Sequence, residues 1–146
     1  MTTEDSGSPG HYFESVKEYP ENSGAKAERV ESFPVLSATI LAFKSWVFGD
    51  IFRGDCHIRS GARYTLFSDG STHWVCDISS SSDDDAWIGF FRCFNALGTV
   101  LFDQGGYNFN IAEEDVVKRW DEFRGPDPRL ARAFNEAEGL QFHCRC

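Results

Sequence analysis

The chain has 146 residues, with 14 Lys and Arg against 23 Asp and Glu and a formal net charge of -9. This length fits one domain with a tail, and it can bury a core without a metal or disulfides. The negative charge repels phosphates and anionic lipids, which argues against nucleic acid and a membrane surface as partners.

Residues 1–31 contain three basic and seven acidic residues and no sustained apolar periodicity. This predicts a polar, acidic arm that is either disordered or forms a short docked helix over Tyr12–Tyr19. We place the folded domain at residues 32–146. The first ten residues lack the pattern of a signal peptide, so we expect a cytoplasmic protein.

Strand patterns follow from Phe33 onward. They cover residues 43–52, 63–67, 72–78, 86–94, 99–104, 116–123 and 140–146. Ser68–Ser71 carries Asp-Gly and predicts a tight hairpin turn. Gly105 and Gly106 are expected to end the strand that precedes them.

One helix is predicted between the last two strands. Asp127 suits the N-cap, Pro128 suits the first helical position, and Gly139 suits the stop. Between them an apolar stripe runs through Leu130, Ala133, Phe134 and Ala137. This stripe predicts packing against the domain.

These elements predict a mainly β fold with one short helix before the last strand. Consecutive strands with short turns indicate an antiparallel meander, and closure into a single calycin-like β-barrel would remove exposed edges. A two-layer β-sandwich is the alternative.

No nucleotide-binding loop or nucleophile elbow is present, and we expect no cofactor. The five cysteines are Cys56, Cys76, Cys93, Cys144 and Cys146. Their odd number and the lack of a signal pattern favour reduced thiols. Strand alternation separates His143 from Cys144 and Cys146, so we expect no metal site there.

The acidic stretch Asp83–Asp85 follows four serines, Ser79–Ser82. Adjacent carboxylates repel, so a solvated loop is the simplest interpretation. Asp85 would then either fix the loop or act as a base at the mouth of a pocket.

Aromatic residues make up 15% of the chain, which suits an apolar interior that holds a small hydrophobic molecule. Such a barrel could also act as a cofactor-independent cyclase or isomerase on a natural-product intermediate. The predicted ligand-binding residues are Trp74, Trp87, Phe91 and Tyr64. In the predicted catalytic set, Asp85 or His73 moves a proton and Arg92 or Arg63 polarises a carbonyl.

The alternative function is an acidic cytosolic inhibitor or immunity protein that binds a basic protein partner. The net charge and the acidic stretches Asp83–Asp85 and Glu113–Asp115 favour it. A structural domain without a ligand is a third interpretation, and a homodimer is compatible with each of the three.

The order of several short motifs resembles an uncharacterised family of small bacterial proteins, known only as a domain of unknown function. The motifs are Trp46, Gly54-Asp55-Cys56, Tyr64–Gly70, Asp84–Trp87 and His143-Cys144. The resemblance covers about residues 43–146 and implies no activity or catalytic residue. It implies that Cys56 and Cys144 are neighbours that join the first and last strands.

Overall fold

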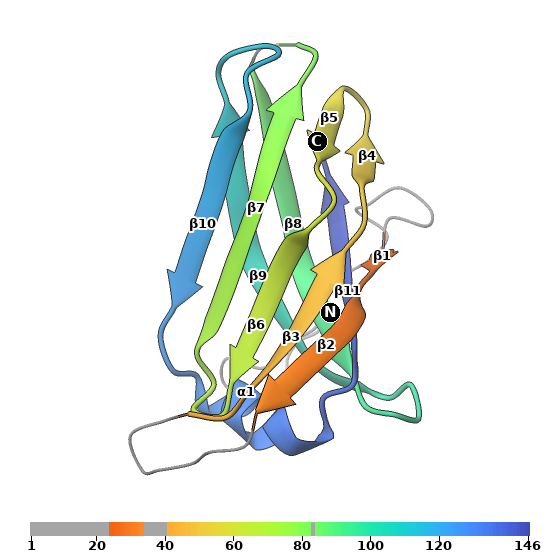
Figure 1. Ribbon diagram of the computed structural model, residues 1–146, viewed down its shortest axis with the longest axis vertical. Helices are drawn as coiled ribbons and strands as arrows, with labels where there is room; N and C mark the ends of the chain where they lie inside the picture. The colour runs from red at the N-terminus through yellow and green to blue at the C-terminus, as the bar shows by residue number, and fades with distance from the viewer. Residues whose placement is uncertain (1–23, 34–40, 83) are drawn as a thin grey trace.

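Two antiparallel sheets face each other (Figure 1). The computed structural model describes residues 24–33, 41–82 and 84–146. The proposed helix over Tyr12–Tyr19 lies outside these residues. No helix among the described residues is long and apolar enough for a bilayer crossing.

The smaller sheet has the strand order β1-β11-β8-β9. Its strands are β1 (Gly24–Lys26), β11 (Gly139–Arg145), β8 (Asp85–Phe94) and β9 (Val100–Ile111). The two glycines predicted to end a strand lie inside β9 instead. Gly106 has a φ of +78°, and the register with β8 shifts between Gly89 and Phe91, so the glycines mark an irregularity within the ladder.

The larger sheet has the order β2-β3-β6-β7-β5-β4, with β10 on the other edge of β7. Its strands are β2 (Glu28–Phe33), β3 (Phe43–Phe48), β4 (Ile51–Arg53), β5 (Cys56–Ile58), β6 (Ala62–Phe67), β7 (Thr72–Ser80) and β10 (Lys118–Arg124). One edge of β7 pairs first with β6 and then with β5. The β4–β5 hairpin therefore continues the line of β6 toward one end of the molecule.

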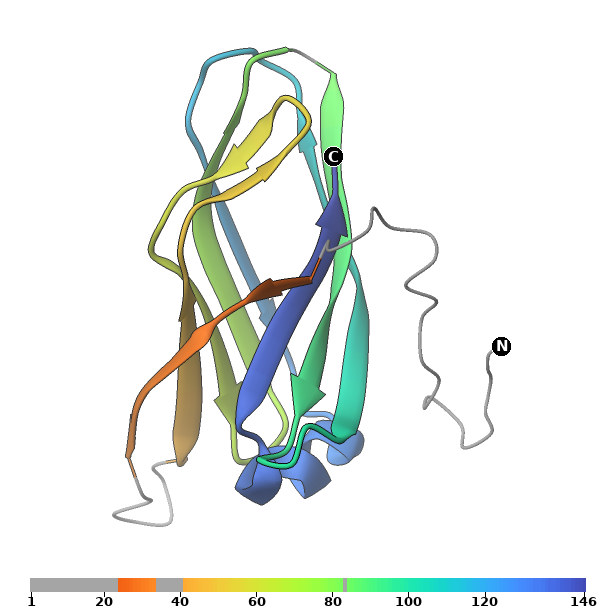
Figure 2. The same ribbon diagram turned by 90° about the vertical axis from the view of Figure 1, so that its right-hand side faces the viewer.

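The two long sides of the molecule differ. On one side, β1 and β2 carry the chain from the smaller sheet to the larger, and Ala27 N donates to Leu140 O at 3.1 Å (Figure 2). On the other side, no ladder joins β9 to β10 within the described residues. The mainly β, antiparallel prediction is confirmed, and without barrel closure in this part of the chain a two-layer sandwich fits at least as well.

Strand β1 and the first four residues of β2 belong to the stretch assigned to the polar arm, residues 1–31. Among the described residues β2 pairs with β3 alone, so it is an edge strand. Edge strands often carry charged residues, and those of β2 hide the alternation that marks the other strands. The predicted strand over residues 43–52 divides into β3 and β4, and β5 is too short to give a periodic signal.

The core consists of aromatic rings in mutual contact. The Phe91 ring lies at its centre, with centroid distances of 4.4 Å to Tyr64, 4.9 Å to Trp74, 4.8 Å to Tyr107 and 4.3 Å to Phe142. All five side chains have 0% exposure. These rings pack against one another between the sheets with offset and edge-on contacts.

The predicted helix forms as α1 (Pro128–Ala133), followed by a short 3-10 helix, η3 (Phe134–Glu136). The Asp127 side chain caps α1 by accepting a hydrogen bond from Arg129 N at 2.9 Å. Both helices lie at one end of the two sheets (Figure 1).

Candidate functional site

Three connections meet at the end of the molecule opposite α1 (Figure 1). They are the β4–β5 turn, the β7–β8 connection and the β9–β10 connection. Ser81 N donates to Asp55 O at 3.0 Å, and Asp115 N donates to Ser80 O at 2.7 Å. We call residues 55, 80–82, 84, 85 and 113–115 the acidic end; it joins both acidic stretches that the sequence singles out.

Serine hydroxyls hold the Asp85 carboxylate. Ser80 Oγ and Ser82 Oγ both donate to Asp85 Oδ2, at 2.6 and 2.8 Å. These bonds lower the pKa of Asp85, because they stabilise the charged carboxylate. Asp85 therefore fixes the loop, which is one of the two interpretations given above. Serine hydroxyls donate these two hydrogen bonds.

The backbone is unusual at two positions of the acidic end. Asp84 has a φ of +64° and Asp115 a φ of +58°, and no other non-glycine residue among those described has a positive φ. Each left-handed residue costs free energy that the surrounding structure must offset. Both acidic connections are thus held in conformations that an unconstrained loop would rarely adopt.

A disulfide joins Cys56 to Cys146, with a Cα–Cα distance of 6.2 Å. The resemblance implies that Cys56 and Cys144 are neighbours, but Cys144 does not take part in the disulfide and is a buried free thiol. Cys144 belongs to β11 and faces the core. Cys146 follows the last residue of β11 and lies next to Cys56 at the start of β5. The expectation of reduced thiols fails for this pair.

The other three cysteines, Cys76, Cys93 and Cys144, are free and buried. Burial raises the pKa of Cys93 and of Cys144 to about 12. A thiol with so high a pKa is a poor nucleophile at neutral pH. These cysteines therefore act as small core side chains.

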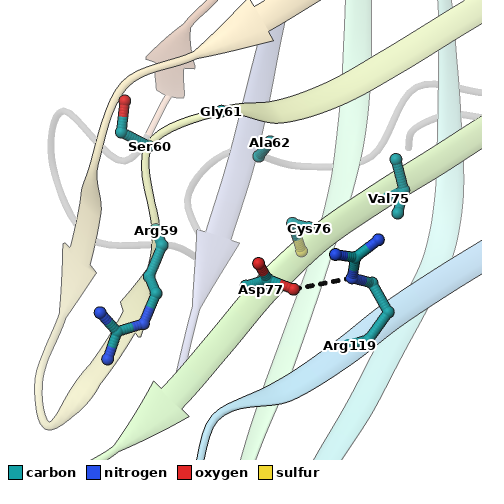
Figure 3. A pocket seen from close by; sticks show the side chains of 8 residues that line it. All are labelled: Arg59, Ser60, Gly61, Ala62, Val75, Cys76, Asp77 and Arg119. Atoms are coloured by element: carbon teal, nitrogen blue, oxygen red, sulfur yellow. Dashed lines mark hydrogen bonds and ion pairs between the residues drawn. The ribbon is translucent and has the colours of Figure 1, made fainter.

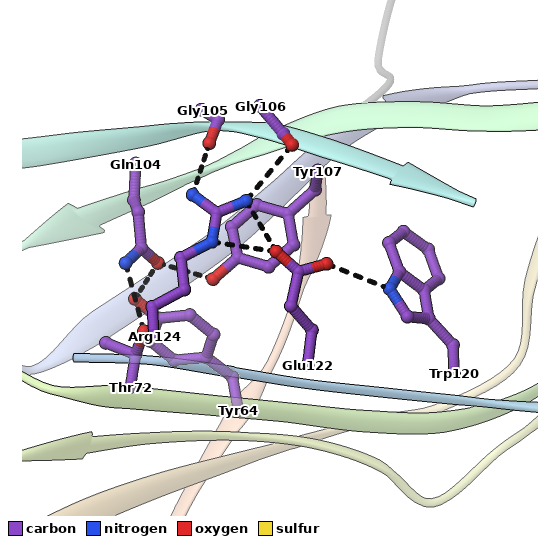
Figure 4. Close-up of polar contacts among 9 residues, drawn as sticks. All are labelled: Tyr64, Thr72, Gln104, Gly105, Gly106, Tyr107, Trp120, Glu122 and Arg124. Carbon is purple, nitrogen blue, oxygen red and sulfur yellow. Dashed lines mark hydrogen bonds and ion pairs between the residues drawn. The ribbon is translucent and has the colours of Figure 1, made fainter.

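The structure places the predicted ligand-binding residues between the sheets. Trp74, Trp87, Phe91 and Tyr64 all have 0% exposure. Tyr64 Oη donates to Gln104 Oε1 at 2.8 Å, and Tyr107 Oη donates to the same oxygen at 2.7 Å (Figure 4). Gln104 Nε2 in turn donates to Thr72 Oγ1 at 3.0 Å.

The same network continues to the side where β9 and β10 lack a ladder (Figure 4). The Arg124 guanidinium lies 3.8 Å from the Tyr107 ring centroid and donates to Gly105 O and Gly106 O, at 2.6 and 3.0 Å. Glu122 accepts from Arg124 Nε at 2.8 Å. These contacts replace the missing ladder, so we assign them a structural role.

The predicted catalytic residues do not converge. His73 and Arg63 point from the outer face of the larger sheet, where His73 Nε2 lies 2.6 Å from Asp121 Oδ1. Arg92 binds Asp103 with two bonds, of 2.7 and 2.8 Å. Asp85 stands apart from them at the acidic end.

A shallow pocket of about 100 Å³ lies beside β7, next to the connection between β5 and β6 (Figure 3). Its lining includes Arg59, Cys76, Asp77 and Arg119, and Arg119 Nε donates to Asp77 Oδ1 at 2.7 Å. Pockets for drug-sized ligands measure roughly 300–1,000 Å³. This one has room for only a very small ligand.

A sequence profile of a family of unknown function, DUF6294, matches residues 63–146, which is more than half of the chain. The chain belongs to the DUF6294 family. This confirms the resemblance to a family of unknown function. No curated protein and no solved structure gives a significant match.

The DUF6294 match begins at the second residue of β6 and runs to Cys146. It contains Asp85 and both acidic stretches, whereas Cys56 and the β4–β5 hairpin precede it. The disulfide thus ties the DUF6294 region to the part of the chain outside the match.

Sequence reasoning missed the pairing of Cys146 and the pocket between Arg59 and Arg119. Both depend on where the β4–β5 hairpin sits beside β7. The Ser79–Ser82 run next to Asp85 was the one available signal for the hydroxyl–carboxylate contacts.

Proposed function

We propose that this DUF6294 protein is a binding module whose acidic end recognises a basic protein partner. The observation that carries the proposal is that three chain segments with six acidic residues meet at one end of the molecule. The six residues are Asp55, Asp84, Asp85, Glu113, Glu114 and Asp115. Lys118 donates to Glu113 and offsets one of these charges.

Like charges held together cost folding free energy, and this cost is recovered when a cationic partner binds. The concentrated negative potential also attracts basic partners and speeds their association. Asp84 and Asp115 add rigid loop conformations, which reduce the entropy lost on binding. An inhibitor or immunity protein for a basic partner would use such a surface.

The test is a titration with a lysine-rich peptide. A triple variant at the acidic end, Asp84→Asn, Glu114→Gln and Asp115→Asn, removes three negative charges. A matched control, Glu28→Gln, Asp121→Asn and Glu136→Gln, removes three exposed charges elsewhere. We expect the acidic-end variant to weaken binding about tenfold or more and the control to weaken it far less, with added salt abolishing the difference.

Equal weakening by the two triple variants would show that only net charge matters, and the proposal would fail. Binding that ignores salt would also contradict it. The predicted homodimer and cytoplasmic location are separate from this test and stay predictions.

A second candidate function is small-molecule binding between the sheets, as in the predicted cyclase or isomerase. Trp74 Nε1 and Trp87 Nε1 are buried without a hydrogen-bond partner in the described part of the chain. A buried, unsatisfied donor costs about 1–3 kcal/mol. A small apolar ligand with an acceptor oxygen would satisfy one of these indoles.

Native mass spectrometry on gently purified protein tests this second candidate. A retained small molecule that is lost in Trp87→Phe would support it. Trp46→Phe is the control, since Trp46 Nε1 already donates to Glu138 O at 2.9 Å. A bare protein mass in every preparation, with no added apolar compound raising the melting temperature, would contradict small-molecule binding.

A further inference from the structure

Three potential metal ligands meet at the acidic end. The Sγ atoms of Cys56 and Cys146 and a carboxylate oxygen of Asp85 lie within 4.8 Å of one another. They come from β5, from the residue after β11 and from the first position of β8. Within the described residues this is the group of His, Cys and acidic side chains whose spacing suits a metal ion.

We propose that the reduced protein binds a zinc ion through Cys56, Cys146 and Asp85. Zinc takes thiolate ligands at about 2.3 Å and carboxylate oxygens at about 2.0–2.2 Å in a tetrahedron. Ligand atoms of such a site are roughly 3.5–3.8 Å apart. The two sulfurs therefore separate by about 2 Å on reduction. The present spread of the three ligand atoms, within 4.8 Å, exceeds the spacing of a tetrahedral site by about 1 Å.

The protein supplies the freedom that this adjustment needs. Cys56 is buried in β5, with 1% exposure, whereas Cys146 is exposed and lies outside the ladder of β11. The Cys146 side chain can therefore move while Cys56 stays in place. The three residues leave the fourth position of the tetrahedron for water or another ligand.

Hydrogen bonds to one oxygen hold the Asp85 carboxylate in place. Both serine hydroxyls donate to Oδ2, and neither of these two bonds uses Oδ1. Hydrogen bonds to a ligating carboxylate fix its direction and tune its affinity for the metal. Two thiolates select zinc over calcium or magnesium, which prefer oxygen-only sites.

The disulfide must open before the metal binds. A trialkylphosphine reductant takes an oxygen atom from water and becomes a phosphine oxide, and each sulfur gains one hydrogen. Zinc then displaces one proton from each thiol. The disulfide and the zinc-bound dithiolate are thus alternative states of the same two cysteines.

Cobalt(II) titration of the full chain tests the proposal, because a cobalt–thiolate bond gives a near-ultraviolet charge-transfer band. The protein is compared with its disulfide intact and after phosphine reduction, with the reductant removed and oxygen excluded. We expect one equivalent of cobalt to bind to the reduced protein only, with the spectrum of a tetrahedral site that zinc abolishes. Cys56→Ser and Cys146→Ser should lose the charge-transfer band, whereas Cys76→Ala should keep it.

Cys146→Ser disturbs the fold less than Cys56→Ser, because Cys146 lies outside the strands and Cys56 is buried in β5. A second measurement is Ser82→Ala, which should keep the band but weaken cobalt affinity about tenfold or more. No band after reduction, or a band that survives Cys146→Ser, would overturn the proposal. An unchanged affinity in Ser82→Ala would remove Asp85 from the ligand set and overturn the three-residue site. None of these outcomes depends on whether a lysine-rich peptide binds.

Discussion

At the helical end, α1 and η3 bury Leu130, Ala133 and Phe134, whereas at the acidic end backbone hydrogen bonds join chain segments that carry six acidic residues. At the helical end, a side chain that is distant in the sequence also donates hydrogen bonds to backbone carbonyl groups. Lys44 Nζ donates to Asn135 O and Ala137 O, at 3.1 and 3.0 Å. The acidic end relies on serine hydroxyls and a disulfide to hold its chain segments in place.

The two ends of the molecule therefore contribute to the free energy of folding with opposite sign. Apolar burial and satisfied carbonyls at the helical end lower the free energy of the fold. Clustered like charges at the acidic end raise it and need restraint. The proposed binding of a basic partner at the acidic end would offset this cost.

The largest expected effect concerns the covalent restraint at the acidic end. Cys56 and Cys146 are 90 residues apart in the chain, and removing a link over such a loop costs about 4 kcal/mol of unfolding free energy. Cys146→Ser should therefore lower the denaturant midpoint steeply. The same loss should follow when the unaltered protein is reduced without metal, and reduction should leave Cys146→Ser unchanged; a variant as stable as the parent would contradict the prediction.

The second effect concerns the interlocked packing at the helical end. Gly70 has a φ of +86°, and an added Cβ would lie 2.0 Å from Asp127 O. Gly70→Ala should therefore destabilise the protein by about 3 kcal/mol or more, because conformational strain and overlap add. Chemical denaturation measures this change.

Gly98→Ala is the matched control for that prediction. Gly98 has a φ of +85° but no atom within 4 Å of the added Cβ. Its substitution should cost only about 1–2 kcal/mol. Equal losses at the two glycines would mean that the contact with α1 contributes nothing.

A smaller effect is expected from pH at the acidic end. The Ser80 and Ser82 hydroxyls lower the pKa of Asp85 from its ordinary value of 3.8. The resulting stabilisation is present above that value and is lost as pH falls through the lower folded-state pKa. An NMR titration of the Asp85 carboxyl carbon should show the lowered midpoint and a rise in Ser82→Ala; a midpoint that Ser82→Ala leaves unmoved would refute the assignment.

The smallest effect comes from relieving charge repulsion. Asp84→Asn keeps a residue type that tolerates positive φ and removes one exposed charge. We expect a gain of about 0.3 kcal/mol at low salt that disappears at high salt. Glu136→Gln at the helical end should give no such gain, and a similar gain there would erase the proposed contrast between the ends.

The sequence predicts features that depend on neighbouring residues. Asp127 and Pro128 locate α1, and Ser68–Ser71 locates the β6–β7 turn, because capping and turn chemistry are local. Alternation likewise identifies Trp74 as inward-facing. It does not reveal that the rings of Phe91 and Phe142 occupy the adjacent space.

The pairing of Cys56 with Cys146 and the meeting of the acidic stretches are not local. The β4–β5 hairpin must continue the line of β6 along β7. In addition, β11 of the opposite sheet must reach the same end of the molecule. The scattered positions of His73, Arg92 and Asp85 have the same origin. Each depends on which sheet and which face its strand occupies, and the spacing of residues along one chain does not encode that.

An NMR titration of the isotope-labelled protein with a lysine-rich peptide at low salt tests the central claim most directly. If the acidic end is the binding end, the amide shifts will concentrate at Asp55, Ser81–Ser82 and Glu113–Asp115, leave α1 unchanged and vanish at high salt. Shifts spread evenly over both ends, or centred on the helical end, would contradict the account.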